Sequence, residues 1–188
     1  MNPQGGDRPG RIFITGFMGS GKSTIGPLLA SALGVRFIDL DTVIEEKEGM
    51  AIPRIFMEKG EPAFRALERR ELLLLSAQNG IVVAAGGGAL TDPVSLAIVQ
   101  RSGVLVYLEV SVDVLVGRLR GISGRPMIAA EDGSLLPDGK LRDRITSLLR
   151  SRENAYRMAD IIVDAGAQSP AGTVSAIVAS LRSLRTTE

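Results

Sequence analysis

The stretch Gly16-Phe17-Met18-Gly19-Ser20-Gly21-Lys22-Ser23-Thr24 matches the phosphate-binding pattern G-x-x-x-x-G-K-[ST] at every required position. The short apolar run 11–15 before it predicts a strand, and residues 23–33 after it predict a helix with one apolar face. This motif binds a nucleoside triphosphate when it lies between a strand and a helix. The alternative is a glycine-rich turn without function, but the complete spacing and the strand–helix context favour triphosphate binding.

The residue types in this loop suit phosphate chemistry. Glycines let the backbone curl until successive N–H groups face one anion, and the helix that follows adds the positive end of its dipole. Lys22 is placed to reach the β- and γ-phosphates, and the Ser23 hydroxyl is a ligand for Mg²⁺. We therefore expect ATP and Mg²⁺ as cofactors, with the nucleotide bound by Gly19, Ser20, Gly21, Lys22, Ser23 and Thr24.

Composition limits the remaining chemistry. The chain has 188 residues, 45% of them hydrophobic, which is enough for one well-buried domain. It contains no cysteine and no histidine, so thiolate nucleophiles, imidazole bases and histidine-bound metals are excluded. Carboxylates, lysine, arginine and hydroxyls are left, and these suit phosphoryl transfer, which depends mainly on positioning and charge neutralisation.

Charge and hydropathy argue against two classes of partner. The net charge is only +1, so no overall field favours nucleic acid or an anionic membrane. No apolar run approaches the length of a membrane span. Residues 1–10 are polar and rich in glycine and proline, without the apolar core of a signal peptide, so we expect a disordered lead-in. We expect a cytoplasmic monomer whose domain covers residues 11–188.

Predicted strands and helices alternate along the chain. Apolar runs at 11–15, 35–40, 81–85, 103–110 and 161–164 predict five strands separated by helical segments. This order indicates a single-domain α/β fold of three layers, α/β/α, with a five-stranded parallel sheet. The irregular stretch 121–139 predicts a mobile lid, and three arginines at its start suit a lid over triphosphate: Arg118, Arg120 and Arg125.

Two further motifs follow predicted strands, where parallel sheets bind ligands. Asp39 and Asp41 end the second strand, and strand alternation predicts that both point to the same side. The alternative is that both only cap the following helix. Gly86, Gly87 and Gly88 end the buried run 81–85, where they allow another group to approach the backbone closely. A flexible turn is the alternative for this triplet.

Together, these motifs resemble those of the shikimate kinase family in type and order. The resemblance covers about residues 11–165 and includes the phosphate loop, Asp39-Leu40-Asp41, Phe64-Arg65, the glycine triplet, Arg125-Pro126, and Arg152 with Tyr156. It implies the fold of the nucleoside monophosphate kinases. It also implies ATP-dependent phosphorylation of the 3-hydroxyl of shikimate, a step of chorismate and aromatic amino acid biosynthesis.

The resemblance also implies roles for individual residues. Asp41 would bind the shikimate hydroxyls and could accept the proton, while Asp39 would support Mg²⁺ through water. Arg65 and Arg152 would hold the substrate carboxylate, and the backbone N–H groups of the glycine triplet would contact the substrate. Lys22, Asp41 and Arg125 would form the catalytic set, with Arg125 closing from the lid. On the adenine side the expected residues are Arg120, or Arg118 in its place, and Gln168.

Two other functions are consistent with the phosphate loop. One is a kinase for another small metabolite, such as a gluconate or nucleoside monophosphate kinase, but the negative charge of Asp39 and Asp41 would oppose a phosphorylated acceptor. The other is a nucleotide switch without a small-molecule substrate. A switch would disperse Asp41, Arg65, Gly87 and Arg152 over the surface, whereas a kinase would gather them in one pocket near the γ-phosphate.

Overall fold

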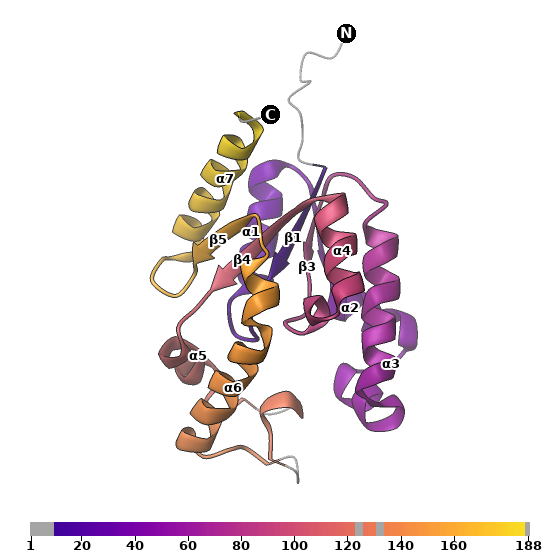
Figure 1. The fold of residues 1–188 in the computed structure, drawn as a ribbon, viewed down its shortest axis with the longest axis vertical. Helices are drawn as coiled ribbons and strands as arrows, with labels where there is room; N and C mark the ends of the chain where they lie inside the picture. The colour runs from indigo at the N-terminus through magenta and orange to yellow at the C-terminus, as the bar shows by residue number, and fades with distance from the viewer. Residues whose placement is uncertain (1–9, 123–125, 131–133, 187–188) are drawn as a thin grey trace.

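The computed structural model describes residues 10–122, 126–130 and 134–186, and strands and helices alternate along it as predicted (Figure 1). Its strands are β1 (Arg11–Thr15), β2 (Arg36–Asp39), β3 (Ile81–Ala84), β4 (Val104–Glu109) and β5 (Ile161–Asp164). Its α-helices are α1 (Lys22–Leu33), α2 (Leu40–Glu48), α3 (Ile52–Leu75), α4 (Pro93–Ser102), α5 (Val112–Leu119), α6 (Asp138–Arg157) and α7 (Pro170–Thr186). Two short 3₁₀ helices are η1 (Ala89–Thr91) and η2 (Pro126–Ile128).

The strands form one parallel sheet in the order β2-β3-β1-β4-β5, which confirms the predicted five-stranded parallel sheet. In the central strand β1, Ile12 lies opposite Val82 of β3 on one side and Val104 of β4 on the other. On one side of β1 lie β3 and then β2 at the edge, and on the other lie β4 and then β5. The loops after β1 and β3 therefore lie side by side at the carboxyl edge of the sheet, where parallel sheets bind ligands.

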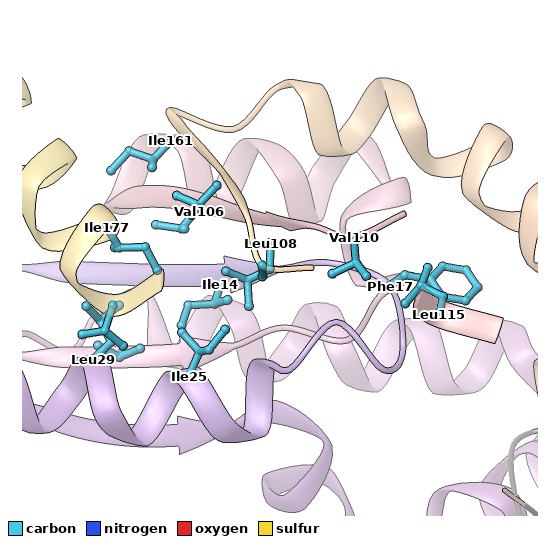
Figure 2. Packing of buried hydrophobic residues seen from close by; sticks show 14 of the residues in the cluster. Ile14, Phe17, Ile25, Leu29, Val106, Leu108, Val110, Leu115, Ile161 and Ile177 are labelled. Atoms are coloured by element: carbon cyan, nitrogen blue, oxygen red, sulfur yellow. The ribbon is translucent and has the colours of Figure 1, made fainter. Parts of the chain in front are cut away.

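Helices cover both faces of the sheet, so the three layers are also confirmed (Figure 1). Side chains alternate along β1: Ile12 and Ile14 pack into the cluster beneath α1 and α7, whereas Phe13 packs into the cluster beneath α3 and α4. Figure 2 shows the first cluster, in which Leu29 of α1 and Ile177 of α7 meet the sheet residues. Burial on both faces explains why the strands are continuous apolar runs in the sequence.

The predicted geometry of the aspartate pair is wrong. Strand β2 ends at Asp39, and α2 begins at Leu40, so Asp41 lies in the first turn of a helix and not on the strand. Asp39 is the N-cap of this helix, because its Oδ1 accepts a hydrogen bond from the Asp41 N–H at 3.0 Å. Asp39 is thus a helix cap, and the first turn of α2 sets the direction of the Asp41 side chain.

Two of the predicted segments lie largely outside the described residues. Of the lead-in 1–10, only Gly10 is described. Within the predicted lid 121–139, residues 123–125 and 131–133 are outside the described part, and Arg125 is one of them. The described part of this segment includes η2 and an antiparallel bridge between Ala129 and Leu135. None of the described helices is both long and apolar enough to cross a membrane.

Candidate active site

A cavity of about 780 Å³ lies at the carboxyl edge of the sheet. The phosphate loop follows β1, the aspartate pair follows β2 and the glycine triplet follows β3, and all three line this cavity. Helices α3 and α6 add Arg65 and Arg152 to the same walls. Residues from distant parts of the sequence therefore converge on one pocket, which is what a small-molecule kinase requires and a nucleotide switch does not.

The phosphate loop has the curled backbone that its glycines predict. Gly16 has φ 151°, and a Cβ there would lie 2.8 Å from the Leu108 carbonyl oxygen, so only glycine fits without a shift. Gly21, with φ 100°, is the N-cap of α1, which directs the unpaired N–H groups of that helix toward the cavity. The buried Ser20 Oγ accepts and donates no hydrogen bond among the described residues, and it also lines the cavity.

Lys22 folds back over its own loop. Its Nζ donates hydrogen bonds to the carbonyl oxygens of Gly16, at 2.7 Å, and Phe17, at 3.1 Å. The side chain lines the cavity and is only partly buried, so its ammonium group stays next to the curled backbone. A positive charge and converging N–H groups together form a site for the phosphates of a nucleotide.

Asp39 and Asp41 both line the cavity, although only one belongs to the strand. A Cβ at Gly86 would lie 3.3 Å from Asp41 Oδ1, so this carboxylate lies against the backbone of the glycine triplet. Ser23 at the start of α1 lines the same cavity as Asp39. The cavity thus offers a hydroxyl and a carboxylate oxygen beside the phosphate loop, and both are the hard oxygen donors that Mg²⁺ prefers.

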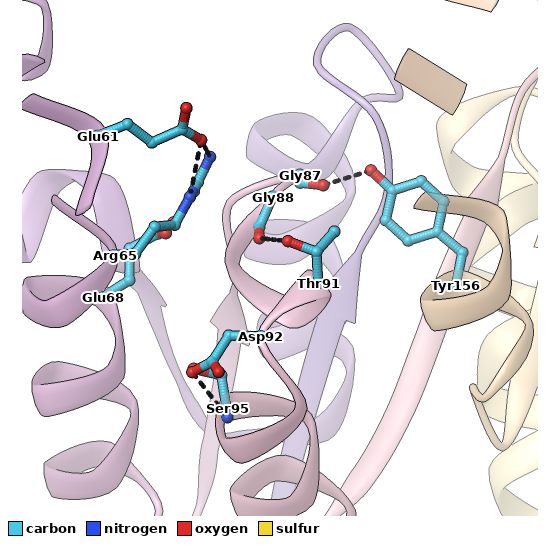
Figure 3. Close-up of polar contacts among 9 residues, drawn as sticks. All are labelled: Glu61, Arg65, Glu68, Gly87, Gly88, Thr91, Asp92, Ser95 and Tyr156. Atoms are coloured by element: carbon cyan, nitrogen blue, oxygen red, sulfur yellow. Dashed lines mark hydrogen bonds and ion pairs between the residues drawn. The ribbon is translucent and has the colours of Figure 1, made fainter. Parts of the chain in front are cut away.

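Arg65 is held between two carboxylates of α3 (Figure 3). Its Nη1 donates to Glu68, while its Nε and Nη2 donate to Glu61 Oε1 at 3.2 and 2.8 Å. Glu68 is 1% exposed. Burial, with a smaller contribution from the charge of Asp41, raises the pKa of Glu68 to about 7 against the attraction of Arg65. Sequence reasoning assigned Glu68 no role in the site beyond pairing with Arg65.

The glycine triplet is fixed from the opposite side by α6. The Tyr156 hydroxyl donates a hydrogen bond to the Gly87 carbonyl oxygen at 2.5 Å (Figure 3). Tyr156 is 1% exposed and its ring stacks on Tyr107 of β4, with centroids 4.8 Å apart. Burial raises the pKa of Tyr156, so its hydroxyl stays protonated and continues to donate. Arg152, one turn earlier, is 5% exposed and lies 5.5 Å from the centroid of the Phe17 ring.

The two arginines that precede the predicted lid, Arg118 and Arg120, lie in different surroundings. Arg118 lines the cavity and donates hydrogen bonds to the carbonyl oxygens of Gly19, at 2.9 Å, and Ala165, at 3.3 Å. Arg120 is not among the lining residues, and its Nη2 lies 2.6 Å from Asp138 Oδ2 on the surface. Gln168, after β5, lines the cavity. Of the two arginines proposed for the adenine side, the geometry favours Arg118.

A phosphate loop facing a pocket of carboxylates and arginines defines a P-loop kinase for a small acidic acceptor. The family model "Shikimate kinase" matches residues 18–182 of the chain. A shikimate kinase of Chlorobium chlorochromatii is 42% identical over 95% of this chain and 94% of its own length. The chain belongs to the shikimate kinase family, a family of kinases that phosphorylate a hydroxyl of shikimate in aromatic amino acid biosynthesis, and the resemblance seen in the sequence is confirmed.

Solved structures agree with this assignment. A shikimate kinase from Acinetobacter baumannii, in complex with shikimate, superposes with a TM-score of 0.83 at 34% identity, covering 93% of this chain and 94% of that one. A gluconokinase from Sinorhizobium meliloti has a TM-score of 0.58 at 24% identity, with coverage of 94% of each chain. The second likeness reflects the shared fold alone.

Some cavity residues had no role in the sequence analysis. Besides Glu68, the cavity has an apolar wall formed by Phe56 and Phe64, whose rings lie 4.8 Å apart, together with Ile52 and Pro53. Glu68 is among the residues that resemble the family, but its position three residues after Arg65 predicts on any helix only an ordinary ion pair. Its burial beside Asp41 depends on the contact of α3 with the sheet, which local spacing does not encode.

Proposed function

We propose that this chain transfers the γ-phosphoryl group of ATP to the 3-hydroxyl of shikimate, giving shikimate 3-phosphate and ADP. One observation carries the proposal: a carboxylate and two arginines line the same cavity as the phosphate loop. Shikimate is a small acid with one carboxylate and several hydroxyls, so it needs a cationic anchor at one end and hydrogen-bond acceptors at the other. Membership of the family supports the same acceptor.

In this proposal Arg65 and Arg152 bind the substrate carboxylate. Both guanidinium groups are already restrained, Arg65 by Glu68 and Arg152 by its burial near Phe17, so little side-chain entropy is lost on binding. The glycine triplet lines the cavity, with Gly86 beside Asp41, Gly87 beside Arg152 and Gly88 beside Arg65, and its N–H groups are proposed to add hydrogen bonds to the bound acid. The substrate is thereby held in one orientation relative to the phosphate loop.

Asp41 accepts a hydrogen bond from the reacting hydroxyl and directs its oxygen toward the γ-phosphorus. In a loose transition state the phosphoryl group carries its charge on three equatorial oxygens, and proton transfer need not precede bond formation. Lys22 and the N–H groups of the loop stabilise that charge, because they are fixed before the reaction begins. The proton of the hydroxyl passes to Asp41 or to water as the new P–O bond forms.

Mg²⁺ fits the oxygen donors beside the loop. We propose that the Ser23 hydroxyl binds the ion directly and that Asp39 supports it through water, since both line the cavity next to the loop. When bound there, the ion would supply positive charge that neutralises the phosphates of the nucleotide. Arg118 and Gln168 would lie along the adenine.

The lid is proposed to cover residues 121–139 and to bring Arg125 onto the transferring phosphoryl group, excluding water from the reaction. The domain is proposed to extend over residues 11–188. Because one chain supplies every residue assigned to the pocket, we propose that it acts as a monomer. Because ATP is the donor, we propose that it acts in the cytoplasm, where ATP is made.

The test is a coupled assay of ADP release with Mg-ATP, with and without shikimate, on the wild type and on Asp41→Asn. We expect ADP release to require shikimate and to fall steeply in the variant, since the amide cannot replace the charged acceptor. Gluconate and AMP serve as alternative acceptors in the same assay. ADP release that is indifferent to shikimate, or faster with AMP, would refute the proposed acceptor.

A further inference from the structure

Glu61 occupies part of the proposed carboxylate anchor. A guanidinium group can bind a carboxylate at two points along its Nε/Nη2 edge or along its Nη1/Nη2 edge. In Arg65 both donors of the first edge contact one oxygen of Glu61, as the dashed lines in Figure 3 show. The negative charge of Glu61 therefore lies against the same cation that the substrate carboxylate is proposed to use.

The two carboxylates around Arg65 differ in how firmly they are held. The side chain of Glu68 is 1% exposed, so moving it would need a rearrangement of the core. The side chain of Glu61 is 48% exposed, so it can turn into water without a rearrangement of the core. Glu68 is thus a permanent partner of Arg65, whereas Glu61 is an exchangeable one.

Local structure keeps Glu61 and Arg65 together until the exchange. Gly60 has φ 78° and ψ 167°, which breaks α3, and Glu61 begins its second half, four residues before Arg65. The guanidinium of Arg65 is pressed against Gly88, where a Cβ would lie 2.5 Å from its Nη2, and Arg65 Cζ lies 5.4 Å from the centroid of the Phe64 ring. Arg65 therefore cannot follow Glu61 outward when Glu61 leaves.

We propose that Glu61 is a built-in competitor for the substrate carboxylate. It neutralises Arg65 in the empty enzyme and must give up the Nε/Nη2 edge when the acid binds, so it weakens the binding of shikimate. This inference rests on the proposed function, because it takes Arg65 as the anchor of the substrate carboxylate. It follows that removing the charge of Glu61 should strengthen shikimate binding. Removing a residue that helps to build the site would weaken it.

The test measures shikimate binding to Glu61→Gln by calorimetry in the absence of nucleotide, together with KM for shikimate. An ion pair this exposed is worth roughly 0.2–1 kcal/mol, so we expect the dissociation constant and KM for shikimate to fall about 1.4- to fivefold. The matched control is Glu58→Gln. Glu58 forms an ion pair with Arg54 at 2.5 Å on the same helix, so its change removes an equal charge without touching Arg65.

Four outcomes distinguish failure of the competitor from failure of the proposed function. Tighter binding in Glu61→Gln, with Glu58→Gln like the wild type, supports the competitor. Unchanged or weaker binding in Glu61→Gln, or equal tightening in both variants, overturns it. Arg65→Lys tests the anchor itself: if it leaves shikimate binding unchanged, the assignment of Arg65 in the proposed function fails, whatever Glu61 does. If Arg65→Lys weakens binding and Glu61→Gln does not strengthen it, only the competitor fails.

Discussion

The two halves of the cavity are built in different ways. The phosphate half comes from one continuous stretch, Gly16 to Thr24, and acts mainly through backbone N–H groups and one lysine. The acceptor half comes from four separate segments, namely α2, α3, the glycine triplet and α6, and acts mainly through charged side chains. Local sequence determines the first half, whereas tertiary packing determines the second.

This difference has an energetic consequence. Backbone donors at a helix N-terminus are fixed by the fold itself, so the phosphate half needs few supporting contacts. In the acceptor half, Arg65, Glu68, Asp41 and Arg152 lie close enough to shift the pKa of Glu68. Each charge there depends on its neighbours, so one substitution is expected to disturb several groups.

Lys22→Met gives the largest expected effect and tests whether the halves are independent. Removing one fixed charge from the transition state typically costs about 10²–10³ in kcat. We expect a loss of that size in steady-state assays. Shikimate binding without nucleotide should stay like that of the wild type, because the Lys22 ammonium group is held by the carbonyl oxygens of Gly16 and Phe17 in its own loop. A parallel loss of shikimate affinity would contradict the separation of the two halves.

Gly88→Ala tests how closely the acceptor half is packed. The added methyl would lie 2.5 Å from Arg65 Nη2 and 2.8 Å from its Cζ, so the guanidinium must move. Displacing a substrate-positioning group by about 1 Å can cost up to about 100-fold, and we expect KM for shikimate to rise about ten- to 100-fold with KM for ATP unchanged.

The control for this change is Gly117→Ala in α5, where a Cβ would meet no atom within 4 Å. Alanine is a better helix former than glycine, so this variant should gain up to about 1 kcal/mol in stability and keep the kinetics of the wild type. If Gly88→Ala also left KM for shikimate unchanged, the contact between Arg65 and Gly88 would have no role in binding.

The same contrast explains how much the sequence could predict. The phosphate loop, the five strands and their helices follow from local patterns, because each strand is a short apolar run and each helix has one apolar face. Asp41 was predicted in the pocket for the wrong geometric reason. Its direction comes from the first turn of α2, and the point where a strand gives way to a helix is among the least certain features of a sequence.

The parts that could not be predicted are those that depend on long-range contacts. Arg118 and Arg120 are two residues apart. Because α5 ends at Leu119, Arg118 belongs to the helix and lines the cavity, whereas Arg120 follows the helix and does not. Tyr156 lies 69 residues from Gly87, and no local pattern links them. The resemblance to a known family supplied Arg152, Tyr156 and the glycine triplet as individual residues, but it did not supply the contact between Tyr156 and Gly87.

Glu68 gives a prediction on pH. Its pKa is about 7 in the folded chain, above its ordinary value of 4.5, so the folded state binds this proton more tightly than the unfolded state. The resulting stabilisation is complete below about pH 4.5 and is lost as the pH rises to about 7, with a slope of at most about 1.4 kcal/mol per pH unit. In urea unfolding, the stability of the wild type relative to Glu68→Gln should therefore fall across this range. A constant difference would mean that Glu68 stays ionised throughout.

Tyr156→Phe gives the smallest expected effect and tests whether a buried hydroxyl positions the glycine triplet. The change removes the hydrogen bond to the Gly87 carbonyl oxygen and keeps the ring that stacks on Tyr107. One such bond is worth about 1 kcal/mol, so we expect kcat/KM for shikimate to fall about fivefold, mainly through KM, with ATP kinetics unchanged. Tyr107→Phe is the matched control, since it removes a hydroxyl from the same stacked pair without touching the triplet. If both variants lost shikimate affinity equally, the stacking of the rings, and not the bond to Gly87, would position the acceptor half.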